Sequence, residues 1–220
     1  MNAPRVVAID GAAGSGKSTL ARSLARALGL PYVNTGLMYR ALAAAALRHG
    51  VQPGDEPNVL GPMRRLRFNL VAGSPDELEV EGYGLDELMS VEVESTVSAV
   101  AGHASVRAHM RRQQRRLGET HGAVMEGRDI ASVVFADAPV KLYLRAPSRL
   151  RAERRADERE TRSVGEVASA LAARDARDAR TNPHEPARGA VVLDTSDLDP
   201  AQTLEAALAV VRERAPELVP

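Results

Sequence analysis

The segment Gly11-Ala12-Ala13-Gly14-Ser15-Gly16-Lys17-Ser18 follows directly after the apolar run 6–9. Its spacing, G-x-x-x-x-G-K-[ST], is typical of a loop that joins a buried strand to a helix and wraps phosphate groups. The glycines permit torsions that turn successive N–H groups inward, and the N-terminus of a helix predicted over 17–28 favours the same anions. The segment predicts a nucleoside triphosphate site, in which Lys17 reaches the β- and γ-phosphates and the Ser18 hydroxyl coordinates Mg²⁺.

Lysine is rare in this chain, which strengthens the interpretation of Lys17. Lysine and arginine together number 29, yet Lys17 and Lys141 are the only lysines. A compact ammonium at the phosphate loop, in a chain that otherwise uses guanidinium, indicates a chemical requirement. Lys141 adjoins the apolar run 140–144, and its position leaves open a role in the site or packing at a strand edge.

The composition excludes several classes of protein. The chain has 220 residues, a formal net charge of zero, no cysteine, and only 3% aromatic residues with no tryptophan. We therefore expect no disulfide or thiolate site, no dedicated nucleic-acid or membrane surface, and no base-stacking platform. No apolar run approaches the roughly 18–20 residues that span a bilayer, and the first strand begins too early for a signal peptide. We expect one cytoplasmic, monomeric domain spanning 1–220.

Short apolar runs alternate with helical patterns along the chain. The runs are 6–9, 32–33, 123–125, 140–144 and 191–193. The predicted helices are 17–28, 36–49, 106–117, 148–158, 164–180 and 201–214, the last with Asp199 as N-cap and Pro200 at the first position. Strands that do not alternate and are separated by helices predict an α/β fold: a five-stranded parallel sheet with helices on both faces.

The pattern changes between residues 67 and 87. The runs 67–71 and 78–81 alternate apolar and polar residues, and 73–76 between them reads as a turn. This predicts a small antiparallel insertion between the second and third strands of the parallel sheet.

Polar residues follow the second and third strands, where open α/β sheets bind ligands. After the second strand come Thr35 and Arg40, which are suited to a base or sugar and to a second phosphate. The third strand runs into Glu126-Gly127-Arg128-Asp129. Gly127 permits close backbone approach to a ligand, and Asp129 offers a carboxylate to Mg²⁺-bound water or to a base amino group. The alternatives are a solvated Arg40 and a surface ion pair at 128–129.

Two arginine series lie at helical spacing. Arg151, Arg155, Arg159 and Arg162 share one face, and Arg174, Arg177, Asp178 and Thr181 form another. A solvated, salt-bridged face is the general explanation for such series. Phosphoryl transfer also needs cations around the moving group, so a role in the site is the competing interpretation.

Taken together, these residues resemble the bacterial-type cytidylate kinases of the nucleoside monophosphate kinase superfamily. The resemblance covers nearly the whole chain. It is carried by the loop from Gly11 to Thr19, by Thr35-Gly36-Leu37-Met38-Tyr39-Arg40, by Ser98, by Val106-Arg107, by Glu126-Gly127-Arg128-Asp129, by the run from Val133 to Lys141, and by Arg174-Asp175-Ala176-Arg177-Asp178.

The resemblance implies an activity and a set of roles. It implies a five-stranded P-loop core, a monophosphate-binding insertion over about 63–93, and a helical lid over about 154–165. It also implies transfer of the γ-phosphoryl group from ATP to CMP or dCMP with Mg²⁺, in pyrimidine nucleotide metabolism. The triphosphate site is the loop Gly11, Ala12, Ala13, Gly14, Ser15, Gly16, Lys17, Ser18 and Thr19; the catalytic residues are Lys17, Arg128 and the lid residue Arg162. The acceptor residues are Thr35, Arg40, Ser98, Arg107, Arg128, Asp129, Arg174 and Asp178, among which Ser98, Arg107 and Asp129 read cytosine.

The chain departs from the family pattern at two positions. Asn34 stands where an aspartate is frequent, and Thr181 stands where an arginine is frequent. Two other functions remain to be distinguished: a kinase for UMP, dTMP or AMP, and a nucleotide-dependent binding module. A binding module has no need for a second phosphate site, so Arg40 and Arg128 favour a kinase.

Overall fold

A computed structural model describes residues 3–71, 78–157, 163–179 and 185–220. Its centre is a five-stranded sheet in the order β2-β5-β1-β6-β7, with all neighbouring strands parallel. The strands are β1 (Val6–Gly11), β2 (Tyr32–Asn34), β5 (Ala123–Gly127), β6 (Val140–Arg145) and β7 (Val191–Asp194). Every residue of β1 is buried, because helices cover both faces of the sheet. The predicted parallel α/β fold is confirmed.

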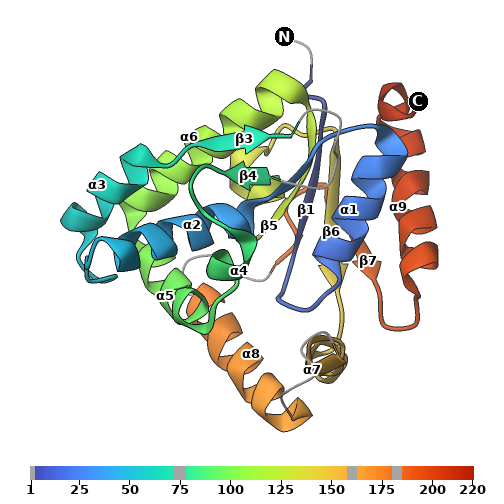
Figure 1. Ribbon diagram of the computed structural model, residues 1–220. Coiled ribbons are helices and arrows are strands. Elements are labelled where there is room, and N and C mark those ends of the chain that lie inside the picture. The colour runs from blue at the N-terminus through green and yellow to red at the C-terminus, as the bar shows by residue number, and fades with distance from the viewer. Residues whose placement is uncertain (1–2, 72–77, 158–162, 180–184) are drawn as a thin grey trace.

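One face of the sheet is covered by α1 (Lys17–Leu28) and α9 (Pro200–Arg214), which lie side by side in Figure 1. Leu20, Leu24 and Val211 from these helices pack in one apolar cluster with residues of β1 and β6. The helix α1 ends at Gly29, whose φ of 61° is left-handed and whose N–H bonds the carbonyls of the last turn. In α9 the predicted cap at Asp199 is present as a full capping box with Gln202.

The other face is covered by α2 (Thr35–Arg48), α6 (Ala104–His121) and the five-residue π-helix η1 (Ile130–Val134). Met38, Met110 and Phe135 are buried in the cluster on this side. A Cβ at Gly118 would lie 2.5 Å from the Phe135 ring, so the glycine of α6 admits that ring. The π-helix was not predicted, and it matters because it begins directly after Asp129.

The segment between β2 and β5 contains the predicted antiparallel pair of strands, β3 (Phe68–Leu70) and β4 (Leu78–Val80). The predicted turn at 73–76 lies outside the described residues. The helices α3 (Glu56–Arg65), α4 (Leu85–Leu88) and α5 (Val91–Gly102) were not predicted. Their start signals are present, since the Asp55 and Ser90 side chains accept from Asn58 N and Val93 N. The insertion is thus more helical than the sequence pattern indicated.

Two helices lie beyond the carboxyl edge of the sheet, α7 (Ser148–Asp157) and α8 (Val164–Ala179) (Figure 1). Ala152, Ala156, Val167 and Leu171 form a small apolar cluster between them. Most of the residues of the predicted lid, 154–165, lie in α7, at the start of α8, or in 158–162, which is outside the description. A last short helix, η2 (Pro216–Leu218), follows α9. Within the described ranges, no helix is long and apolar enough to span a membrane.

Candidate active site

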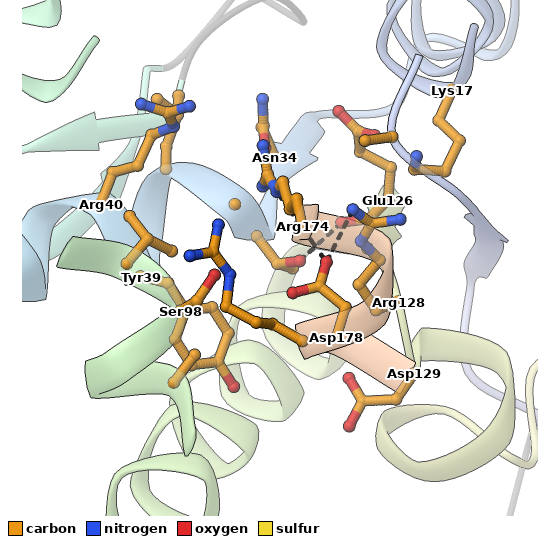
Figure 2. A pocket seen from close by; sticks show the side chains of 18 of the residues that line it. Lys17, Asn34, Tyr39, Arg40, Ser98, Glu126, Arg128, Asp129, Arg174 and Asp178 are labelled. Carbon is orange, nitrogen blue, oxygen red and sulfur yellow. Dashed lines mark hydrogen bonds and ion pairs between the residues drawn. The ribbon is translucent and has the colours of Figure 1, made fainter. Parts of the chain in front are cut away.

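A pocket of about 510 Å³ opens at the carboxyl edge of the sheet, between the phosphate loop, the start of α2, α5, the end of β5, and α8. Its walls include the eight acceptor residues named from the sequence: Thr35, Arg40, Ser98, Arg107, Arg128, Asp129, Arg174 and Asp178. They also include Ala13, Gly14, Lys17 and Ser18 of the loop. The structure therefore brings the two sets of residues to one cavity (Figure 2). Arg162 and Thr181 lie outside the described residues.

The phosphate loop holds Lys17 in a buried position. Its ammonium donates to the Ala12 carbonyl at 2.7 Å. Burial, together with the nearby Arg128 guanidinium, lowers the pKa of Lys17 from its ordinary value to about 7. Gly14 has a φ of 74°, and a Cβ there would lie 2.8 Å from the Arg151 carbonyl. Glycine is therefore required at this turn both by its torsion and by the close approach of α7.

A buried network lies beside Lys17. The Tyr32 hydroxyl donates to Glu126 Oε1 at 2.7 Å, and the Ser18 hydroxyl hydrogen-bonds the same tyrosine oxygen. The side chain of Thr35 donates to the Glu126 carbonyl at 2.7 Å. Glu126 is 4% exposed and lines the pocket. Tyr32 and Glu126 had no role assigned from the sequence, because their pairing depends on β2 lying next to β5 in the sheet.

The space that a side chain at Gly127 would occupy is filled by the side chains of Thr35 and Ile130. A Cβ at this position would lie 2.6 Å from Thr35 Oγ1 and 2.8 Å from the Ile130 side chain. From the sequence, Gly127 was expected to permit close approach of a ligand to the backbone. That interpretation did not include Thr35 and Ile130. The glycine admits Thr35 and Ile130 as well as bordering the pocket.

Arginines from the three helices α2, α7 and α8, and Arg128 directly after β5, gather around carboxylates in the pocket. Glu94 Oε1 of α5 lies 3.7 Å from Arg40, 3.8 Å from Arg155 and 3.8 Å from Arg174. Asp178 lies 2.9 Å from Arg128 and 3.9 Å from Arg174 (Figure 2). Burial lowers the pKa of Arg174 to about 10. Such a concentration of cations favours a bound anion.

Arg40 is only 7% exposed, which removes the alternative of a solvated helix residue. Its guanidinium donates to the Leu88 carbonyl at 3.0 Å. Arg128 is likewise anchored, because it donates to the Gly11 carbonyl at 2.9 Å. Both cations are therefore held in fixed directions rather than extended into solvent.

Asp129, Ser98 and Arg107 line the part of the pocket beside α5 and α6. Asp129 is paired with Arg111 of α6 at 3.0 Å, an ion pair that the sequence analysis missed. Tyr39, which is partly buried and also lines the pocket, hydrogen-bonds the Gln114 side chain, and loss of solvent around its hydroxyl raises the pKa of Tyr39. The arrangement places a carboxylate, a guanidinium and a hydroxyl together in one wall of the pocket.

The helix α7 is attached to the phosphate loop by Arg151. Its guanidinium donates to the Ala13 carbonyl at 2.9 Å and to Asp175 of α8 at 2.7 Å. Arg155, one turn further along, lines the pocket. The face that carries the first arginine series is therefore directed at the site over its described part. Lys141, in contrast, lies in the interior strand β6, donates to the Ala136 and Arg188 carbonyls and does not line the pocket.

The fold and the site define a P-loop protein. It has a five-stranded parallel sheet, a phosphate loop after β1, and a second group of cations at the same edge of the sheet. The sequence profile of the family "Cytidylate kinase" matches residues 7–213. The cytidylate kinase of Chloroflexus aggregans is 41% identical over 216 residues, 92% of this chain and 91% of the relative. That of Acidiphilium cryptum is 41% identical over 97% of this chain and 98% of the relative, and that of Mycobacterium avium is 40% identical over the same shares. The chain belongs to the cytidylate kinase family and is an enzyme of that family.

Proposed function

We propose that this pocket binds ATP at the phosphate loop and CMP or dCMP between α2, α5 and α8, and that the γ-phosphoryl group passes directly from one to the other. The bond from the γ-phosphorus to its bridging oxygen breaks, and a bond to an oxygen of the acceptor phosphate forms, giving ADP and CDP or dCDP. The observation that carries this proposal is that Lys17 and the eight acceptor residues line one cavity. The family implies the use of ATP.

The acceptor phosphate is already an anion, so the reaction needs no strong general base. Catalysis then consists of positioning and of neutralising charge on the moving group. Lys17 and Arg128 are the cations we assign to this role, and Arg162 is a third that we assign from the resemblance alone. Arg128 is suited to it because its guanidinium is fixed to Gly11 of the phosphate loop.

The phosphate of CMP takes the place of internal counter-ions in this proposal. Glu94 and Asp178 form ion pairs with Arg40, Arg174 and Arg128. A phosphate dianion offers stronger, bidentate contacts to the same guanidinium groups. The arginines are therefore arranged for an anion before it arrives.

Cytosine presents an amino donor beside the acceptors N3 and O2. The Asp129 carboxylate accepts from the amino group in this proposal, and Arg107 and Ser98 donate to the acceptors. Uracil has a carbonyl in place of the amino group, so it offers Asp129 no hydrogen-bond donor and places an oxygen against the carboxylate. The same polar groups thus account for both binding and discrimination.

The donors beside the phosphate loop suit Mg²⁺. Hydroxyl and carboxylate oxygens are its preferred ligands, and Ser18 and the buried Glu126 supply them in one hydrogen-bonded network through Tyr32. Ser15 Oγ, also in the loop, is buried without a hydrogen-bond partner among the described residues. We propose that Ser18 binds the ion and that Glu126 orients its water. When bound, Mg²⁺ neutralises charge on the β- and γ-phosphates.

The experiment that tests the proposed function is a measurement of ADP formation from ATP and Mg²⁺ with CMP, dCMP, UMP, dTMP and AMP offered separately. We expect turnover with CMP and dCMP and far less with the others. Preference for another monophosphate would contradict the assigned base readers and keep the kinase. ATP binding without acceptor-dependent turnover would instead indicate a nucleotide-binding module.

A further inference from the structure

Asp10 is a buried carboxylate that the proposed reaction does not use. It lies near the end of β1, directly before the phosphate loop, and is 3% exposed. Its Oδ1 accepts from Ile130 N at 2.9 Å, and its Oδ2 accepts from Ala131 N at 2.8 Å. Both oxygens are thus committed to the first two residues of η1, which lie 120 and 121 positions further along the chain.

These bonds attach the segment that carries Arg128 and Asp129 to the strand that carries the phosphate loop. Asp10 pairs with Gly127 in the parallel register, and Arg128 donates back to the Gly11 carbonyl at 2.9 Å. The segment from Gly127 to Ala131 is therefore fixed to β1 on both sides of Asp129. A shift of this segment would move the acceptor residues relative to Lys17.

Only a carboxylate satisfies both amides. An asparagine in the same place offers one acceptor oxygen and directs its NH₂ group at an N–H donor. Burial opposes the charge and raises the pKa of Asp10 to about 6, although both backbone hydrogen bonds act to lower it. A carboxylate kept at this cost, beside a pocket, indicates a function for the two hydrogen bonds that it accepts.

We propose that Asp10 is a positioning residue that sets the register between the phosphate loop and the segment of Arg128 and Asp129, and so aligns the acceptor with the triphosphate. The inference rests on the roles proposed above for Arg128 and Asp129. It extends them because Asp10 acts through the backbone of η1 and touches neither substrate.

The test is Asp10→Asn, assayed for CMP kinetics and, separately, for ATP binding by calorimetry. A displacement of about 1 Å costs on the order of 100-fold in rate. We therefore expect kcat/KM for CMP to fall by about 10- to 100-fold, with a smaller preference for CMP over UMP, while the Kd for ATP changes less than about 3-fold. An equal loss for ATP and CMP, or no loss, overturns the proposal.

The matched control is Asp199→Asn, which changes a carboxylate that also accepts a backbone N–H, from Gln202 at 2.8 Å, but lies at the start of α9. It is expected to leave the kinetics unchanged and to change the melting temperature little, because asparagine caps a helix about as well as aspartate does. Asp10→Ser, which keeps one acceptor in less volume, serves as the second variant. If neither Asp10 variant folds, the carboxylate serves the fold itself and the positioning role is wrong.

A double-mutant cycle of Asp10→Asn with Asp129→Ala separates this inference from the proposed function. If Asp10 acts through Asp129, the two losses in kcat/KM for CMP are not additive. If Asp129→Ala by itself lowers kcat/KM for CMP, additive losses contradict the positioning role. If Asp129→Ala alone leaves the CMP kinetics unchanged, the proposed recognition of cytosine is wrong. The positioning role of Asp10 is then decided by whether Asp10→Asn lowers kcat/KM for CMP more than it weakens ATP binding.

Discussion

The chemistry of the site depends on single residues and on the neighbours that the fold gives them. Lys17 combines a hydrogen bond to Ala12 with a pKa near 7. Asp129 sits between the pocket and Arg111. Each was selected from the sequence for its chemical type, whereas its electrostatic state follows from its neighbours.

Lys17 is expected to take up a proton when ATP binds. Its lowered pKa, about 7, leaves it largely neutral at pH 8, and the phosphates favour the charged form. Uptake is therefore expected at pH 8 and should decline towards pH 6, where Lys17 is already charged. Calorimetry in two buffers of different ionisation enthalpy measures it. Lys17→Met should abolish the uptake and lower kcat by at least about 100-fold, with no loss of melting temperature in the absence of ATP.

Near-normal turnover by Lys17→Met would disprove its role as the triphosphate anchor. The control is Asp199→Asn, measured in the same two buffers. This substitution lies at the start of α9 and should retain the full proton uptake. Uptake in Lys17→Met equal to that of the unchanged protein would assign the proton to another group.

Asp129→Ala is expected to weaken CMP binding by about 10- to 100-fold, because a charged hydrogen bond to the cytosine amino group is lost. ATP binding should change by less than about 3-fold. Titration of each nucleotide separately measures both effects. Equal losses for CMP and ATP would move Asp129 to the Mg²⁺ shell, the alternative that the sequence left open.

At the scale of elements, α5 is the helix that completes the acceptor side of the pocket. It supplies Ser98 and the Glu94 carboxylate that neutralises arginines from α2, α7 and α8. No helix was predicted there, because its apolar, small and acidic residues show no strong periodicity. Its position follows from packing against α2, α6 and α8.

Glu94→Gln should tighten CMP binding while destabilising the protein without ligand. The carboxylate competes with the acceptor phosphate for Arg40, Arg155 and Arg174, and without it these cations repel one another. We expect Kd for CMP to fall by about 2- to 5-fold and the melting temperature without ligand to fall. Calorimetry and thermal unfolding measure the two changes. Weaker binding of CMP would show that Glu94 supports the site rather than competes in it.

At the scale of the molecule, the pocket joins parts of the chain that are far apart. The phosphate loop, the acceptor insertion and α8 meet at one edge of the sheet, and Arg128 and Arg151 connect them. ATP and CMP together should therefore stabilise one cooperative fold.

We predict a monomer with no acceptor residue supplied by a second copy. The large exposed apolar side chains in the described ranges include Leu85 and Val91, which lie close in sequence on α4 and α5. Light scattering should give a mass near 23.5 kDa with and without nucleotides, and kcat should not depend on protein concentration. A dimer that dissociates on Leu85→Ser would contradict this prediction and locate the interface.

The cytoplasmic location remains a prediction from the sequence.

The sequence by itself determined the phosphate loop, the parallel strands, the hairpin and the residue types of the site, because each depends on local spacing and periodicity. Only the tertiary structure decided which of these residues meet. Tyr32 reaches Glu126 across 94 positions, and Asp10 reaches Ile130 across 120. Such pairs depend on which strands are neighbours and in what register. The same holds for Glu94 among its arginines and for Arg111 beside Asp129, since these contacts exist only once the helices have packed.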